Sequence, residues 1–190
     1  MDDDEMEPEE IIAATRLWLE KAVIGLNLCP FAKPVYLREQ IRYVVSGAES
    51  PEALVADLMA ELRHLQATDP EQVETTLIIH PKVLTGFLDY NDFLEVAETV
   101  VDDLGLTGEI QVASFHPHYQ FEGTGPDDIE NYTSRSPYPM LHLLREASVE
   151  RAVDAVPDPS EIYEANIETM RRLGHAGWRR LFTPLKIVPK

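Results

Sequence analysis

The residues from Ser114 to Pro139 read SFHPHYQFEGTGPDDIENYTSRSPYP and combine histidines, carboxylates, an arginine and aromatics in one short span. His116 and His118 stand one residue apart, and an extended chain alternates its side chains with period two, so both rings can point to one side. With a carboxylate from the same span they would suit a divalent metal. The candidate carboxylates are Glu122, Asp127 and Asp128. Alternatively, both histidines are hydrogen-bonded loop residues.

Arg135 is surrounded in the sequence by hydroxyl and aromatic residues. A guanidinium binds a carboxylate or a phosphate through two parallel hydrogen bonds, and the start of a following helix would favour the same negative charge. We therefore expect Arg135, with Tyr119, Asn131 and Ser136, to bind a small anionic substrate. The same arginine would equally serve to tie the loop to the neighbouring helices.

His142 precedes Arg145 and Glu146 by three and four residues. In a helix these side chains project from one side, so Glu146 would orient the imidazole and raise its basicity. The catalytic residues expected from the sequence are therefore His116, His142, Arg135 and Glu146. An ordinary ion pair on a helix surface is the alternative for His142 and Glu146.

Cys29 is the single cysteine of the chain and lies in NLCPFAKP. It follows the expected end of a helix, where the helix dipole works against a thiolate, and its neighbours are apolar. We expect a small buried residue here rather than a nucleophile.

Three β candidates alternate with helices. Periodicity and capping residues predict strands over residues 41–47, 75–81 and 108–117, and helices over residues 9–28, 50–66, 88–106, 139–153 and 158–174. This order predicts an α/β fold with a small parallel or mixed sheet of three or more strands covered by helices. A ferredoxin-like α+β fold is the alternative.

The predicted strands end in Ser46-Gly47, in His80-Pro81 and in His116-Pro117-His118. In sheets with parallel crossovers, ligands bind beyond the carboxyl ends of the strands. The histidines would therefore meet at one edge, provided that the second and third strands run parallel.

Length and net charge limit the number of domains and the kinds of partner that we expect. The 190 residues predict an acidic disordered tail over residues 1–8 and a single globular domain over residues 9–190. A net charge of −18 repels phosphate backbones and anionic lipid, so we expect neither nucleic acid nor membrane as a partner. The lone cysteine and the acidic start of the chain favour the cytoplasm.

Three stretches, LNLCPFAKPV, SFHPHYQFEG and NYTSRSPYPMLHLLRE, together resemble the bacterial family catalogued as domain of unknown function 1415. The resemblance covers nearly the whole chain after the acidic start. It implies a single cytosolic bacterial domain and supplies no reaction and no residue roles.

Taken together, these patterns favour a small-molecule enzyme that uses histidine and arginine, with or without a metal, on an anionic substrate. A non-catalytic binding or interaction module is the alternative, with Tyr119, Phe121 and Tyr138 as contact groups. A third possibility is that the segment is a structural wrap with its polar groups satisfied internally.

Overall fold

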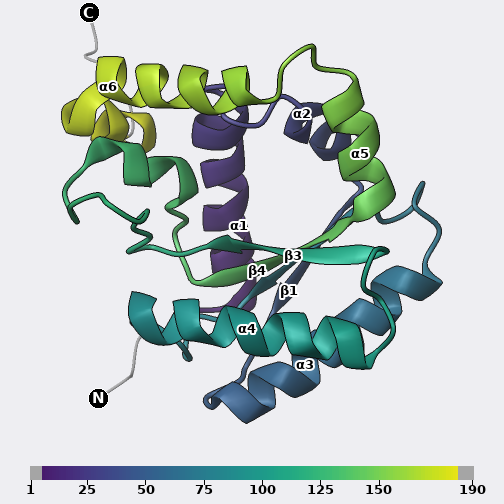
Figure 1. The fold of residues 1–190 in the computed structure, drawn as a ribbon. Helices are drawn as coiled ribbons and strands as arrows, with labels where there is room; N and C mark the ends of the chain where they lie inside the picture. The colour runs from purple at the N-terminus through teal and green to yellow at the C-terminus, as the bar shows by residue number, and fades with distance from the viewer. Residues whose placement is uncertain (1–5, 184–190) are drawn as a thin grey trace, which may run out of the picture.

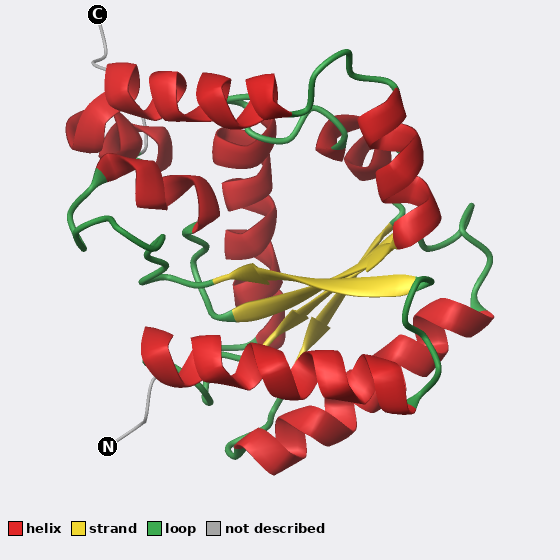
Figure 2. Cartoon of the chain, viewed as in Figure 1, coloured by secondary structure: helices red, strands yellow, loops and turns green. Residues whose placement is uncertain are grey.

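A computed structural model describes residues 6–183 as a four-stranded sheet with helices on both faces (Figure 1, Figure 2). Residues 1–5, most of the expected acidic tail, lie outside the described part, and Pro8 already begins the first helix. The elements are α1 Pro8–Trp18, η1 Leu19–Ile24, α2 Ala32–Leu37, β1 Ile41–Val45, α3 Pro51–Ala67, β2 Thr75–Ile79, α4 Phe87–Asp103, β3 Ile110–Phe115, η2 Ile129–Ser134, β4 Met140–Arg145, α5 Glu146–Asp154 and α6 Ser160–Phe182.

The strand order is β1-β2-β4-β3. β1 and β2 pair in parallel, whereas β4 is antiparallel to both β2 and β3, so β1, β2 and β3 all run in one direction. α3 and α4 cover one face, and α1 covers the other, on which α2, α5 and α6 also lie (Figure 1). The predicted mixed α/β sheet is therefore confirmed. The ferredoxin-like alternative does not apply, because its helices would lie on one face only.

The α3–α4 face of the sheet carries the larger core. Ser50 caps α3 by accepting a hydrogen bond from the Ala53 amide at 3.2 Å, and Pro51 occupies the first helical position. The apolar stripe of α3 is fully buried: Leu54, Leu58, Leu62 and Leu65. It packs with Ile78 of β2 and with Leu141 and Leu143 of β4.

The opposite face is covered by α1 and its continuation η1, a π-helical segment. Trp18, Ala22 and Val23 pack there against Leu77, Ile79 and Met140 of the sheet. The wider π-helical turn changes the direction of successive side chains relative to an α-helix, and such segments occur often at functional sites. Here it follows Trp18, whose ring packs edge-on against Phe115 of β3 at 5.1 Å between centroids.

The segment MLHLLR was expected to be helical but forms the central strand β4. A strand covered on both faces has apolar residues at consecutive positions and lacks the alternation that identifies a half-exposed strand. Pro139 does not distinguish a helix from a strand here, because proline is found at the first position of both. The helix predicted over residues 139–153 is thus replaced by β4 and α5.

The helix α6 continues to Phe182, beyond its predicted end, and bends at Gly174, which has φ 64° and ψ 174°. This backbone conformation is accessible essentially only to glycine. The bend turns the last part of α6 back toward η2 (Figure 1). No helix of residues 6–183 is long and apolar enough to cross a membrane.

Candidate functional site

Polar residues gather at the carboxyl edge of the three strands that share a direction. Ser46 follows β1, His80 follows β2 and His116 follows β3. Because β2 and β3 are both antiparallel to β4, they run parallel to each other, which is the condition the sequence argument required. The Tyr90 ring of α4 lies between the two histidines, with centroid distances of 5.9 Å to His80 and 4.9 Å to His116.

Both histidines hold the loop between β2 and α4. His116 Nε2 lies 3.0 Å from the Leu84 carbonyl oxygen, and its Nδ1 accepts the His118 amide at 3.0 Å. His80 Nδ1 lies 2.9 Å from the Val83 carbonyl oxygen. Leu84 has φ 55°, unusual for a residue other than glycine, so these bonds stabilise a strained turn.

Burial keeps the two histidines neutral. It lowers the pKa of His80 to about 4 and also lowers the pKa of His116. His80 Nδ1 donates its proton to a carbonyl, so its Nε2 is an acceptor, and this buried atom has no hydrogen-bond partner within residues 6–183. These features describe a closed structural network more than an exposed acid–base site.

Among the described residues, His116 and His118 have no third ligand beside them to complete the metal site that the His-x-His spacing suggested. Their ring centroids lie 6.0 Å apart, and both nitrogens of His116 are already hydrogen-bonded. Across the described residues, no three or more His, Cys, Asp or Glu side chains form a group that could hold a metal. A metal at His116 would therefore have to displace an existing bond.

His142 lies on the opposite face of the sheet from His116. Its ring is close to that of Phe115, at 5.9 Å between centroids, whereas the His116 ring contacts Phe87 and Tyr90 of α4. Because Thr75 donates its hydroxyl proton to the Leu143 carbonyl, His142 Nε2, 2.6 Å from that hydroxyl, must carry the proton. Burial lowers the pKa of His142 to about 4.

The predicted pairing of His142 with Glu146 is wrong. His142 belongs to β4 and not to a helix, and four residues of strand span about 13 Å. Glu146 begins α5 and lines a different recess beside Glu98 and Asp102. The expected catalytic group of His116, His142, Arg135 and Glu146 is consequently not assembled in one place.

Arg135 ties the long loop together. Its Nε donates to the Tyr119 carbonyl at 3.0 Å and its Nη2 to the Pro126 carbonyl at 2.6 Å. The guanidinium lies over the Tyr132 ring, 4.4 Å from the centroid. No carboxylate of residues 6–183 forms an ion pair with Arg135, so its charge is not neutralised by a neighbour.

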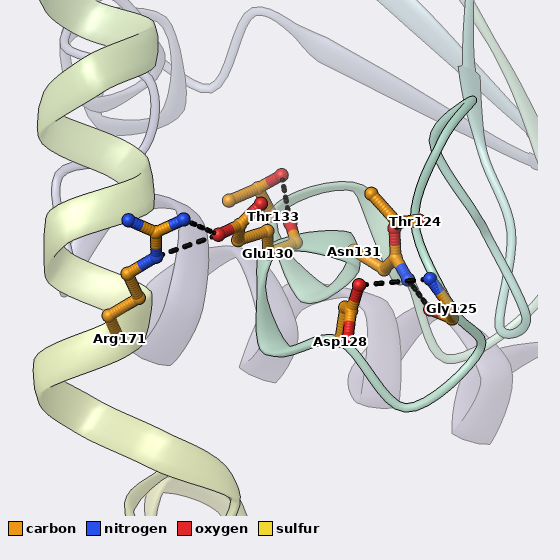
Figure 3. Close-up of polar contacts among 7 residues, drawn as sticks. All are labelled: Thr124, Gly125, Asp128, Glu130, Asn131, Thr133 and Arg171. Carbon is orange, nitrogen blue, oxygen red and sulfur yellow. Dashed lines mark hydrogen bonds and ion pairs between the residues drawn. The ribbon is translucent and has the colours of Figure 1, made fainter.

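Asn131 is the fully buried centre of that loop. Its Oδ1 accepts the Phe121 amide at 2.9 Å and the Thr124 hydroxyl at 2.8 Å. Its Nδ2 donates to the Gly125 carbonyl at 2.8 Å (Figure 3). Ser136 is also buried and donates to the Tyr138 carbonyl at 2.6 Å. The side chains expected to contact substrate at these two positions therefore serve the loop itself.

Tyr119 and Phe121 pack edge-on against each other at 5.0 Å, and Tyr119 also contacts Phe87. Both aromatics are partly buried, as is Tyr138. The three residues are thus integrated into the body of the domain rather than displayed together as an exposed contact surface.

Contacts with Glu130, Asp127 and Tyr132 fasten helix α6 to the loop. Arg171 pairs with Glu130, with Nε 2.7 Å from Oε1 (Figure 3). After the bend, His175 Nε2 lies 2.8 Å from the Asp127 carbonyl, and Trp178 packs edge-on against Tyr132 at 5.3 Å. These contacts fix the second half of α6 beside η2.

A cavity of about 560 Å³ lies where α1, η2, the loop and the bent end of α6 meet. It brings together three of the predicted residues, His118, Arg135 and Ser136. The remaining lining is mainly apolar and aromatic: Ala14, Leu17, Trp18, Pro117, Tyr132, Pro137, Trp178 and Phe182. His118 is exposed, and neither of its ring nitrogens has a hydrogen-bond partner in the described part of the chain.

The sequence matches a known protein family over most of its length. The family model described as "Protein of unknown function (DUF1415)" matches residues 10–180. The chain belongs to the DUF1415 family. Neither the curated proteins nor the solved structures contain a match.

In this DUF1415 domain, two residues of the stretches quoted above have environments that the sequence did not indicate. Arg145 donates to the carbonyls of Leu65, Thr68 and Val73 and so binds the carboxyl end of α3. Cys29 is exposed and lines a second recess of about 350 Å³ with Phe115, so the expectation of a buried cysteine is wrong.

The residues missed by sequence reasoning are the aromatic walls of the large cavity. Trp18 belongs to the apolar face of α1, and Trp178 and Phe182 lie beyond residue 174, where the last predicted helix ends. Their common cavity depends on the bend at Gly174, and an isolated glycine in a helical pattern does not show in which direction a helix will turn.

Proposed function

We propose that this protein binds a small organic anion in the 560 Å³ cavity, with Arg135 as its anion contact and His118 as its acid–base group. The observation that carries the proposal is the convergence of His118 and Arg135 on one cavity with aromatic walls. Ligand sites commonly combine such an apolar lining with a few polar groups that fix orientation.

The charge of the lining supports an anionic ligand. The chain has 34 acidic residues, yet no Asp or Glu of residues 6–183 lines this cavity. Other recesses are lined by acids, for example Glu49, Asp89 and Asp92 beside the β2–α4 loop. The half-buried guanidinium of Arg135 is held in place by two carbonyls, which leave its full positive charge available.

His118 suits the acid–base role better than the other candidates because its ring is exposed at the cavity. A non-catalytic binding role would use the same contacts and differ only in the absence of proton transfer. The net charge of −18 supports a small molecule as partner in preference to nucleic acid or a membrane. We retain the cytoplasm as the proposed compartment.

Tryptophan fluorescence tests the proposal directly. Trp18 and Trp178 are the only two tryptophans of the chain, and both line the cavity. We expect benzoate, phenyl phosphate or acetate to change the fluorescence saturably, with a matching heat signal in calorimetry. His118→Gln and Arg135→Lys should weaken binding, whereas the exposed histidine variant His64→Gln should not. Unchanged fluorescence and no heat with all three anions would refute the proposal.

A further inference from the structure

We infer that the ligand of this cavity is an aromatic monocarboxylate, an inference that rests on the function proposed above. Three features of the lining carry it: the arrangement of the rings, the small number of free donors, and the negative potential of the surrounding protein.

The rings favour a flat apolar body. Trp178 packs edge-on against Tyr132 and against Phe182, with centroid distances of 5.3 Å and 5.5 Å. Trp18 contributes a fourth ring from α1. An acetate-sized anion would leave most of this apolar surface in contact with water, whereas an aryl group would bury it and meet the rings edge to face.

The donors favour a single carboxylate. Arg135 uses Nε and Nη2 for the loop carbonyls, and its Nη1 has no hydrogen-bond partner among residues 6–183. Ser136 already donates its hydroxyl proton to Tyr138, so it can only accept. One guanidinium edge and the His118 ring match one carboxylate, but they leave a phosphate dianion with unpaired oxygens.

The electrostatic environment disfavours a second negative charge. The cavity is bordered by Phe182 at the end of α6, where Arg179 and Arg180 offset the negative pole of the helix dipole, so the repulsion of a second charge comes from the protein as a whole. The whole chain carries a net charge of −18. A monoanion therefore gains the contact with Arg135 at a smaller repulsive cost than a dianion does.

Calorimetric titration with four naphthalene and acetate probes tests this class. We expect 2-naphthoate to bind about tenfold more tightly than 2-naphthyl phosphate or 2-naphthamide, the ratio that one lost charged hydrogen bond corresponds to, and also more tightly than acetate, which lacks the aryl group. If 2-naphthyl phosphate bound as tightly as 2-naphthoate and in the same cavity, the monocarboxylate class would be overturned while the proposed function stood. If no probe bound, the proposed function itself would fail.

A charge variant outside the loop keeps the test informative even if Arg135 variants misfold. Leu17 lines the cavity from α1 and is 40% exposed, so Leu17→Glu should fold and place a carboxylate at the ligand. We expect a loss of about tenfold or more in 2-naphthoate affinity, and a much smaller loss for neutral 2-naphthamide or with Leu17→Gln. Leu88→Glu on α4, where Leu88 is 77% exposed, is the matched control and should bind normally. Equal losses for the carboxylate and the amide would contradict the inference.

Discussion

His116 and His118 stand one residue apart, and their surroundings differ in every respect that bears on function. His116 is fully buried, and hydrogen bonds engage both of its nitrogens. His118 is exposed at the aromatic cavity and makes no side-chain hydrogen bond within the described residues. Both are histidines of the same short segment, so neither residue type nor position in the sequence distinguishes them. The direction of each side chain relative to the sheet therefore separates a structural histidine from one available for chemistry.

The regions around His116 and His118 differ in the same way. The sheet-edge network of His80, His116 and Tyr90 is closed, neutral and attached to backbone carbonyls. The cavity region has an unpaired guanidinium and an exposed imidazole against aromatic walls. We expect substitutions in the network to change stability, and substitutions at the cavity to change ligand binding.

The largest expected effect is that of His116→Ala. It removes two hydrogen bonds, leaves the part-buried Leu84 carbonyl and the His118 amide without their partner, and should lower the free energy of unfolding by about 3 kcal/mol. His118→Ala should change it by less than about 0.5 kcal/mol. Urea denaturation of both variants measures this difference in stability. Equal losses for the two variants would contradict the prediction.

The second prediction concerns pH. A histidine whose pKa is lowered from 6.5 to about 4 in the folded protein contributes stability above pH 6.5 that is lost as the pH falls toward 4. Between about pH 7 and about pH 5, His80 should therefore account for roughly 2 kcal/mol of lost stability. The His80→Asn variant retains a donor for the Val83 carbonyl. Between about pH 7 and about pH 5, its free energy of unfolding should fall by roughly 2 kcal/mol less than that of the wild type.

Urea denaturation at the two pH values measures this difference. The control is His64→Asn, because His64 is exposed on α3 and the substitution should leave the pH dependence as in the wild type. An identical pH dependence for His80→Asn and the wild type would show that His80 is not kept neutral by burial.

The third prediction concerns the bend at Gly174, which places the end of α6 beside the cavity. Gly174→Ala introduces a side chain where φ is 64°, and although no atom within 4 Å would obstruct the new Cβ, the conformation should cost about 1 kcal/mol. The strain would move the end of α6, and with it Trp178 and Phe182, so ligand affinity should fall more than stability does. The measurements are denaturation and 2-naphthoate calorimetry. Gly47→Ala, at an exposed and unobstructed site, is the control, and equal behaviour of the two variants would contradict the role of the bend.

The smallest expected effect is that of the ion pair between Arg171 and Glu130. Arg171 is exposed, so replacing it with Gln should lower the free energy of unfolding by at most about 1 kcal/mol. High salt should reduce the difference between this variant and the wild type, because exposed charges are screened. A loss well above that value, insensitive to salt, would mean that α6 is held to the loop more strongly through this pair than a surface ion pair allows.

Much of the fold was accessible to sequence reasoning because its signals are local. The cap and the leucine stripe of α3 specify a helix and its buried face without reference to the rest of the chain. The β-branched run of β2 and the ends of β2 and β3 placed histidines at the edge of the sheet, as found. These conclusions needed only residue order and periodicity.

The site could be predicted only in part, because its members come from distant segments. Sequence reasoning chose His118, Arg135 and Ser136, which do share a cavity, but it grouped them with His142 and Glu146, which do not. It also missed Trp18 and Trp178 as cavity residues, since two apolar helix faces far apart in the chain carry no signal that they will face each other.

The sequence by itself determined most of the local elements, with β4 as an exception, and the residues able to react, since both depend on side-chain chemistry within a few positions. Tertiary structure decided which of those residues remain available. Pairing of β4 between β2 and β3 assigned His142 to one face of the sheet, while His116 faces α4 on the other. The bend at Gly174 joined α6 to α1 around Arg135. Both outcomes depend on long-range packing, in which a side chain's partners are set by the whole fold rather than by its neighbours in sequence.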